Sequence, residues 1–220
     1  MKKLFNENCE ANQAHIFPVF KEVVKTIPYP IKRVFEVACG SGQHMAHMLP
    51  QVPDLTWTCT DLEAVNTDSA MAWACELAPA VRSRFEGARP MDILNTESVK
   101  QIKPASYHVL FASNLFHISP IEVTAAFVSL AGYALAKGGI ILYYGCMLVD
   151  GKPTTESNAR FDEGLRRRDA SWGIRDIAFV EAKGRKCGIV LEQKHRVANW
   201  RQWQRDDMPD NNFLLVFRKV

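Results

Sequence analysis

The segment Val34–His44 reads Val34-Phe35-Glu36-Val37-Ala38-Cys39-Gly40-Ser41-Gly42-Gln43-His44. A short apolar run with one acidic residue, Glu36, ends in the turn Gly40-Ser41-Gly42, and a helix-compatible segment follows. Glycines let backbone N–H groups approach a ligand closely, and a helix N-terminus adds the positive end of its dipole. The segment therefore predicts a buried strand, a tight turn and a helix that together bind a nucleotide-like ligand.

Length and composition are those of one ordinary globular domain. The chain has 220 residues, of which 47% are hydrophobic and 23% charged, and its net charge of +3 is too small to indicate a nucleic-acid partner by itself. It contains no apolar run of membrane-spanning length, and its first residues lack the apolar core of a signal peptide. The six cysteines form no C-x-x-C pair. We expect a reduced cytoplasmic protein without a metal site.

Apolar strands alternate with helix-compatible segments along the chain. The expected strands are 33–38, 55–60, 84–93, 107–112, 140–144, 189–192 and 213–217, and the expected helices are 11–26, 43–49, 66–77, 96–102, 121–136, 158–168 and 176–186. Such alternation predicts a parallel sheet covered on both faces, and the last two strands lack an intervening helix of standard length, which allows an antiparallel pair.

This order predicts an α/β protein with a Rossmann-like class I methyltransferase fold. Its seven-stranded sheet would be mostly parallel, with an antiparallel C-terminal strand and helices on both faces. Ligands of such sheets bind at the carboxyl ends of the strands. We expect a single domain over 1–220, with an N-terminal helical segment at about 8–27 and a substrate-side insertion at about 148–176.

The glycine turn distinguishes between nucleotide ligands. A dinucleotide-binding turn needs a third glycine for close helix–strand packing, and Met45 occupies that position here. The Gly-Lys-Ser/Thr end of an NTPase phosphate loop is absent. The segment from Glu36 to Gly42 instead resembles the S-adenosylmethionine (SAM) methyltransferase signature acid-x-Gly-x-Gly-x-Gly, with Ala38 in the first glycine slot. An alanine fits that slot if its φ is negative.

Further residues agree with this signature in order and spacing. Asp61 ends the second strand, where a carboxylate accepts both ribose hydroxyls, and Asp92 follows the third strand, where it can hold the adenine amino group beside Ile93. Asn114 leaves the fourth strand toward the methyl donor. As alternatives, Asp61 could be a helix cap and Asp92 a turn former. The complete expected cofactor set is Glu36, Ala38, Gly40, Ser41, Gly42, His44, Asp61, Leu62, Asp92, Ile93 and Asn114.

Five motifs extend the resemblance over nearly the whole chain: Gly42-Gln43-His44, Ser113–Pro120, Ser157–Arg166, Trp172–Asp176 and Met208–Asn212. In this order they resemble a family of small methyltransferase-like proteins of bacteria and eukaryotes that includes methyltransferase-like protein twenty-six. The resemblance implies methyl transfer from SAM, with S-adenosylhomocysteine as product, and it names no substrate. Two departures stand out. Gly145-Cys146-Met147 replaces an expected Gly-Pro-Phe, and no arginine precedes Asn12.

The predicted catalytic residues are His117, Asn114 and Tyr144. His117 is able to remove a proton near neutral pH, and a structural histidine that hydrogen-bonds the loop backbone is an equal alternative. Asn114 could orient an amine through its carbonyl oxygen. Tyr144 ends the fifth strand, where it either closes the pocket or lies at the sheet edge as an amphipathic residue.

The insertion supplies the predicted acceptor-binding residues Asn158, Asp162, Arg166, Trp172 and Arg175. The first three share one face of the expected helix, and the other two follow in a loop. Arginine binds a carboxylate or phosphate bidentately, which favours an anionic group on the acceptor. The alternative for Asp162 and Arg166 is a surface i, i+4 salt bridge. His44 and His47 lie i, i+3 on the first helix after the turn, but no third metal ligand accompanies them.

Three functional hypotheses follow. The first is a methyltransferase for a small polar acceptor, with a carboxylate as one option; the second is a methyltransferase for RNA or protein. The third is a SAM-binding interaction module that has lost catalysis. The basic and aromatic segment 194–205 would suit single-stranded nucleic acid. Three aspartates between 206 and 210 follow at once, which favours a solvated face. We therefore expect a small-molecule substrate, with no membrane or nucleic-acid partner.

Overall fold

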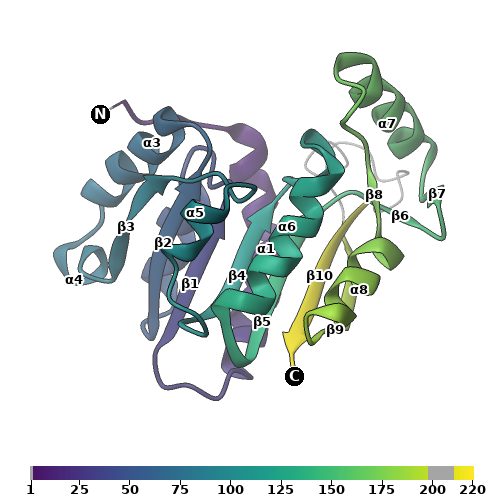
Figure 1. Cartoon of the computed structure of the whole chain (residues 1–220). Coiled ribbons are helices and arrows are strands. Elements are labelled where there is room, and N and C mark those ends of the chain that lie inside the picture. Colours follow the sequence, from purple (N-terminus) through teal and green to yellow (C-terminus); the bar gives the residue numbers. More distant parts are fainter. Residues whose placement is uncertain (1, 198–210) are drawn as a thin grey trace.

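The computed structural model describes residues 2–197 and 211–220. Among these, a central sheet of seven strands has the order β3-β2-β1-β4-β5-β10-β9 (Figure 1). Its strands are β1 Lys32–Val37, β2 Leu55–Asp61, β3 Phe85–Pro90, β4 Tyr107–Ser113, β5 Leu135–Gly145, β9 Ile189–Val197 and β10 Asn212–Lys219. β1 to β5 pair in parallel, whereas β10 is antiparallel to both β5 and β9. The predicted sheet, including its antiparallel C-terminal strand, is confirmed.

Helices cover both faces of the sheet and define two apolar cores. On one face lie α1 Glu7–Lys25, α2 Gln43–Met48 and α3 Ala64–Cys75, whose side chains pack with those of β1, β2 and β4. On the other lie α6 Ile121–Ala134 and α8 Ile177–Lys186, with the short α5 Thr96–Lys100 beside them. Alternate residues of a strand face opposite sides. We call the apolar cluster on the α1 side of the sheet the α1 core and the cluster on the α6 side the α6 core. Tyr143 accordingly belongs to the α6 core and Tyr144 to the α1 core.

A small subdomain follows β5 at the carboxyl edge of the sheet. The strands β6 Met147–Val149, β7 Lys152–Pro153 and β8 Arg175–Asp176 form a second sheet in the order β7-β6-β8, and α7 Glu156–Arg168 connects β7 to β8 (Figure 1). The helix expected from 158 begins two residues earlier, at Glu156, and β7 was not predicted. The hydroxyl of Thr155 caps α7 by accepting from the Asn158 N–H.

Two helix boundaries were also wrong, and three short elements were not predicted. α6 was expected to reach 136 and ends at Ala134, because β5 already pairs with β4 from Leu135 onward. α3 was expected from 66 and begins at Ala64, and the Asn66 side chain donates to Asp61. The four-residue helix α4 Pro79–Arg82 and the 3-10 turns Leu49–Gln51 and Phe116–Ile118 were not predicted.

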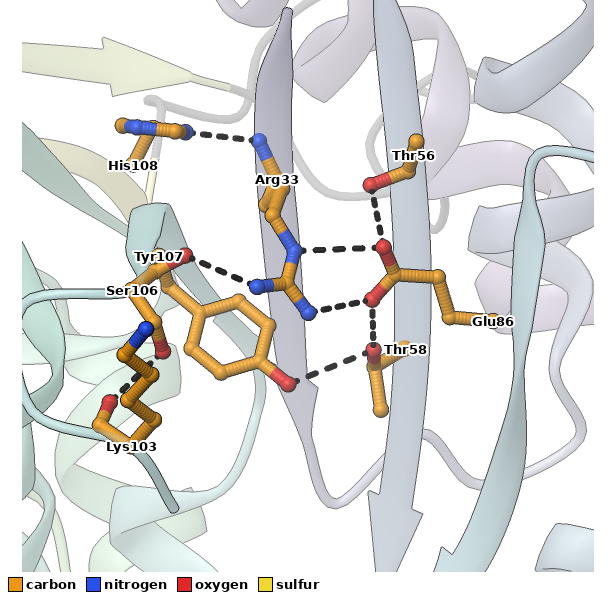
Figure 2. Close-up of polar contacts among 8 residues, drawn as sticks. All are labelled: Arg33, Thr56, Thr58, Glu86, Lys103, Ser106, Tyr107 and His108. Atoms are coloured by element: carbon orange, nitrogen blue, oxygen red, sulfur yellow. Dashed lines mark hydrogen bonds and ion pairs between the residues drawn. The ribbon is translucent and has the colours of Figure 1, made fainter.

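A polar network joins four strands at the amino edge of the sheet (Figure 2). Arg33 of β1 donates to both carboxylate oxygens of Glu86 on β3, at 3.1 and 2.8 Å. The hydroxyls of Thr56 and Thr58 on β2 donate to the same carboxylate, and Thr58 lies 3.4 Å from the Tyr107 hydroxyl of β4. The network satisfies these polar groups within the sheet, at the edge opposite the glycine turn.

Candidate functional site

The glycine turn joins the end of β1 to α2 through three residues with positive φ. Ala38, Gly40 and Gly42 have φ values of 56°, 54° and 83°. The expectation that Ala38 keeps a negative φ is therefore wrong. The next residue, Cys39, is fixed beside β2 by a 3.0 Å hydrogen bond from its N–H to the Thr60 carbonyl. An L-residue in the left-handed region costs about 1–2 kcal/mol, so the turn holds a strained alanine.

The two glycines of the turn have different surroundings. A Cβ on Gly40 would meet no atom within 4 Å, so the space beside this backbone is open. A Cβ on Gly42 would lie 2.5 Å from the Cα and 2.7 Å from the Cβ of Ala70 on α3. Gly42 therefore permits helix packing, and Gly40 leaves room at the carboxyl edge of the sheet for a ligand to approach the backbone.

Asp61, at the end of β2, lies beside this open space. Its Oδ2 accepts from the Gly40 N–H at 2.9 Å, and its Oδ1 accepts from the Glu63 N–H and from Asn66 Nδ2, each at 3.0 Å. A carboxylate offers about four acceptor positions, and three are occupied here. The side chain is 7% exposed. Asp61 thus fixes the turn and keeps about one acceptor position for a ligand hydroxyl.

Apolar side chains lie exposed next to Asp61 and after β3. Leu62 is 66% exposed and Leu94 48% exposed, whereas Ile93 is buried. The Asp92 carboxylate accepts from the Leu94 N–H at 2.8 Å, which is the turn-forming alternative raised from the sequence. Exposed leucines at the ends of two neighbouring strands offer an apolar surface on which a planar ring can pack.

Glu36 and His44 are buried beneath the turn. Glu36 Oε2 accepts from Trp57 Nε1 at 2.8 Å and from the Cys59 thiol at 3.3 Å, and burial raises the pKa of this carboxyl to about 8. His44 packs edge-on against Phe111, and burial lowers its pKa to about 3. Its Nδ1 is buried and has no hydrogen-bond partner within the part of the chain that the structure describes. Both groups support the turn from inside the α1 core.

The end of β4 is held against β5. Asn114 has a φ of 58°, a left-handed conformation that asparagine tolerates better than most residues, and its N–H donates to the Tyr144 carbonyl at 2.7 Å. The Tyr144 hydroxyl donates to Asn12 Oδ1 at 2.9 Å and accepts from Asn212 Nδ2 at 2.8 Å. These contacts bring α1, β5 and β10 together at the carboxyl edge of the sheet.

His117 lies in the turn after β4, between the sheet and the small subdomain. Its Nδ1 is 3.4 Å from Cys146 Sγ, its ring packs against Phe161 of α7, and its carbonyl accepts from the Gly173 N–H at 3.1 Å. Burial, with a smaller contribution from the charge of Arg175, lowers its pKa to about 4. The imidazole is therefore neutral at physiological pH, and its contacts are those of a side chain that orders a loop.

The predicted acceptor residues of the insertion are bonded to the protein itself. Arg175 donates to the carbonyls of Phe116, Ser119 and Ser171 at 2.5–3.2 Å. Arg166 pairs with Asp162 at 2.9 Å, and the same carboxylate accepts from the Ile174 N–H at 2.6 Å.

Asn158 is 2% exposed and donates to the Thr154 hydroxyl and the Asn211 carbonyl. Trp172 stacks with Arg168, whose guanidinium carbon lies 5.2 Å from the ring centroid. These residues therefore shape the small subdomain and attach it to β10 and to the loop after β4. The motif residues 208–210 and most of the basic and aromatic segment 194–205, from 198 onward, lie outside the described part of the chain.

Sequence reasoning missed the role of α1 in this site. Gln13 Nε2 donates to the Gln43 carbonyl at 2.8 Å, and Gln43 Oε1 accepts from the Asn6 N–H at 2.6 Å. Asn12 and Gln13 are both buried in a helix whose other buried residues are apolar. Adjacent amides within an apolar helical face were the available signal, because a buried amide needs hydrogen-bond partners.

Two classes of feature are absent from the described residues. They contain no group of three or more histidine, cysteine or acidic side chains placed to hold a metal ion. Within the same part of the chain, none of the helices has the length and apolar character needed to cross a bilayer.

Comparison with known proteins identifies the family. A family model described as "Protein of unknown function (DUF938)" matches residues 3–219, which is almost the entire chain. The chain belongs to this family. The family description names no activity, and the likeness of its motifs to methyltransferase-like protein twenty-six stays a prediction.

Solved methyltransferases share the fold at low sequence identity. An O-methyltransferase family protein from Burkholderia thailandensis matches with a TM-score of 0.68 and 16% identity over 95% of this chain and 58% of its own. A second match is geranyl diphosphate C-methyltransferase from Streptomyces coelicolor A3(2), in complex with Mg2+, geranyl diphosphate and S-adenosylhomocysteine. Its TM-score is 0.69 and its identity 11%, over 92% of this chain and 80% of its own. The CurJ carbon methyltransferase has a TM-score of 0.64 and 18% identity, over 95% of this chain and 54% of its own.

These likenesses confirm the predicted Rossmann-like methyltransferase fold for this member of the family. The chain spans little more than half the length of two of the three solved proteins.

Proposed function

We propose that this protein is a SAM-dependent methyltransferase that acts on a small polar acceptor. The observation that carries the proposal is the open space beside Gly40, next to Asp61, at the carboxyl edge of a sheet with the methyltransferase strand order. The bound S-adenosylhomocysteine of the geranyl diphosphate enzyme supports SAM as the cofactor.

The residues at this edge fit the parts of SAM. The Gly40 backbone would lie against the methionine portion, Asp61 would accept from a ribose hydroxyl, and the exposed Leu62 and Leu94 would pack on the adenine ring. Asp92 is exposed close to these residues and would accept from the adenine amino group. When bound, SAM would supply a methyl group on a positively charged sulfur. A nucleophile in line with the carbon–sulfur bond would take the methyl group, and S-adenosylhomocysteine would be the leaving group.

The chain's own residues would act by positioning the acceptor. Holding two reactants in attack geometry accounts for a large share of such a rate enhancement. Asn114 and Tyr144 are tied together by a backbone hydrogen bond, and His117 is fixed between Cys146 and Phe161. A neutral His117 imidazole could accept a proton from the acceptor, and its role as a base stays a prediction. A carboxylate on the acceptor would have to compete with Asp162 for Arg166.

Titration calorimetry with SAM tests the cofactor assignment. We expect wild-type protein to bind SAM and Asp61→Asn to bind it about 10- to 100-fold more weakly, because a hydrogen bond to a charged group contributes about 1.5–3 kcal/mol. Asp54→Asn is the matched control, since Asp54 pairs with Lys32 before β2, at the opposite edge of the sheet. Absence of SAM binding, or equal affinity in Asp61→Asn, would refute the assignment.

Methyl transfer itself needs a second measurement. Protein that binds SAM is incubated with methyl-labelled SAM and with separated small-molecule, RNA and protein fractions of a cell extract. We expect label in the small-molecule fraction. Label in RNA or protein would establish the alternative acceptor class, and bound SAM without any transfer would indicate a silent binding module.

A further inference from the structure

Three buried polar side chains from distant parts of the sequence meet at the carboxyl edge of the sheet. Asn12 of α1, Tyr144 of β5 and Asn212 of β10 form what we call the amide–tyrosine triad. Their exposures are 3%, 0% and 8%. The Tyr144 hydroxyl donates to Asn12 Oδ1 at 2.9 Å and accepts from Asn212 Nδ2 at 2.8 Å. One hydroxyl therefore fixes the orientation of two amides.

This arrangement leaves a donor and an acceptor on either side of the tyrosine. Because Asn12 uses its Oδ1 on Tyr144, its Nδ2 is the group left to donate. Asn212 uses its Nδ2, so its Oδ1 is left to accept. Neither of these two atoms makes a hydrogen bond with another described residue. Neither atom is among the fully buried, unpaired side-chain atoms of the described residues, so both reach solvent and are accessible to a polar ligand.

The triad lies at the carboxyl edge of β5 and β10, where we expect the methyl acceptor to bind, whereas the methyl donor is expected at the end of β1. β5 and β10 are the second and third strands from β1, which places them roughly 10 and 14 Å from the strand that carries the glycine turn. The backbone hydrogen bond from Asn114 to Tyr144 links the triad to the loop after β4. A molecule held by the triad would face the methyl donor bound at Gly40.

Two further buried atoms have no hydrogen-bond partner among residues 2–197 and 211–220. They are His44 Nδ1, on the same face of the sheet, and Asn211 Oδ1, next to Asn212 in the chain. His44 and Asn211 are 4% and 6% exposed. Leaving a buried polar atom unpaired costs about 1–3 kcal/mol, and a bound polar molecule would remove part of that cost.

Among the described residues, the ionisable groups named below for this part of the protein are either mainly neutral at pH 7 or already paired. Burial raises the pKa of Tyr144, lowers that of His44 to about 3 and raises that of Glu36 to about 8, so each is mainly neutral at pH 7. Arg175 is bonded to three carbonyls, and Arg166 pairs with Asp162. None of these described groups is left to act as a counterion, and an uncompensated charge buried at the triad would cost several kcal/mol.

We propose that Asn12, Tyr144 and Asn212 bind the methyl acceptor and select an uncharged polar molecule, one that offers a hydroxyl, a carboxamide or a similar paired donor and acceptor. This inference rests on the proposed methyltransferase function and refines its acceptor class. Tyr144 acts as a positioning residue, because its only acidic proton is held by Asn12. The selection excludes carboxylates and cationic amines.

Labelled-methyl transfer with charge-sorted substrates tests the inference. A deproteinised extract of cells that express the protein is separated by ion exchange at pH 7 into anionic, cationic and neutral fractions. Each fraction is incubated with the purified protein and methyl-labelled SAM. We expect incorporation in the neutral fraction. Tyr144→Phe and Asn212→Asp should lower it at least tenfold while the SAM dissociation constant stays within twofold. Tyr107→Phe, which removes a buried hydroxyl at the opposite edge of the sheet, is the matched control and should retain wild-type incorporation.

The outcomes separate this inference from the proposed function. Failure of wild-type protein to bind SAM refutes the proposed function itself. SAM binding with label in a charged fraction, or in none, refutes the uncharged acceptor alone. An equal fall of SAM affinity and incorporation in Tyr144→Phe would place the triad in the cofactor site and overturn the assignment. Thermal unfolding of each variant identifies any that fails to fold. If a variant does not fold, the charge class of the fraction that wild-type protein labels still tests the uncharged acceptor.

Discussion

Alanine substitution at the two glycines of the turn should separate folding from cofactor binding. Gly42 has a φ of 83°, and a methyl group there would lie 2.5 Å from the Ala70 Cα. The left-handed conformation costs about 1–2 kcal/mol and overpacking about 1–3 kcal/mol, whereas reduced freedom of the unfolded chain returns about 0.4–1 kcal/mol. Gly42→Ala should therefore lose about 1–4.6 kcal/mol of unfolding free energy, which for a chain of this size lowers Tm by about 2–18 °C.

Gly40→Ala should behave differently, because its methyl group would meet no atom within 4 Å. Only the left-handed conformation opposes it, so the expected loss is about 1 kcal/mol or less. The same methyl group occupies the space assigned to SAM, so SAM affinity should fall at least tenfold. Urea unfolding followed by circular dichroism measures the first effect, and calorimetry below both unfolding transitions measures the second.

A second substitution tests the physical cause at Gly42. Ala70→Gly removes the Cβ at 2.7 Å but leaves the Cα at 2.5 Å, so the double variant should recover less than half of the lost stability. Loss of less than 1 kcal/mol in Gly42→Ala would show that α3 moves aside and would refute the packing argument. Unchanged SAM affinity in Gly40→Ala would refute the assignment of the open space to the cofactor.

Three further variants test buried charge and loop order. Because burial raises the pKa of Glu36 to about 8, the stability that this carboxyl contributes is complete below about pH 4.5 and is lost as pH rises to about 8. In urea unfolding, the unfolding free energy of Glu36→Gln relative to wild type should therefore grow by about 2 kcal/mol between pH 6 and 7.5. The pKa of His117 is lowered to about 4, so the stability that this residue contributes should be lost as pH falls from about 6.5 toward 4. The rate of turnover should show no titration near pH 6.5. Unchanged turnover in His117→Ala would exclude this residue as the base. Arg175→Lys should lose about 2–4 kcal/mol, because an ammonium cannot reproduce the planar set of bonds to three carbonyls, and its SAM affinity should match wild type.

The strand order and the glycine turn follow from local sequence patterns. Short apolar runs that alternate with helix-compatible segments predicted the parallel sheet, and two terminal strands without a helix between them predicted the antiparallel C-terminal strand. Glu36 before the turn, Met45 after it and Asp61 at the end of β2 predicted a SAM-type site. The inferences about the fold succeed because strand burial, turn conformation and helix periodicity depend on residues close together in the chain, and the SAM-type site stays a prediction.

Local patterns could not assign the separate roles of similar residues. Gly40 and Gly42 look equivalent in sequence, yet one faces open space and the other the backbone of α3. Ala38 adopts a positive φ that its residue type disfavours. Arg175 suited an anion clamp by type, and its guanidinium instead binds three carbonyls of neighbouring loops.

The sequence by itself therefore determined the fold class and the position of the turn. The tertiary structure decided which side chains meet. Tyr144 lies 132 residues from Asn12 and 68 from Asn212, and only the packing of α1 and β10 on either side of β5 brings the three within hydrogen-bond distance. The physical reason is range: backbone preference and burial are encoded by near neighbours, whereas a hydrogen-bond partner is chosen by the fold as a whole.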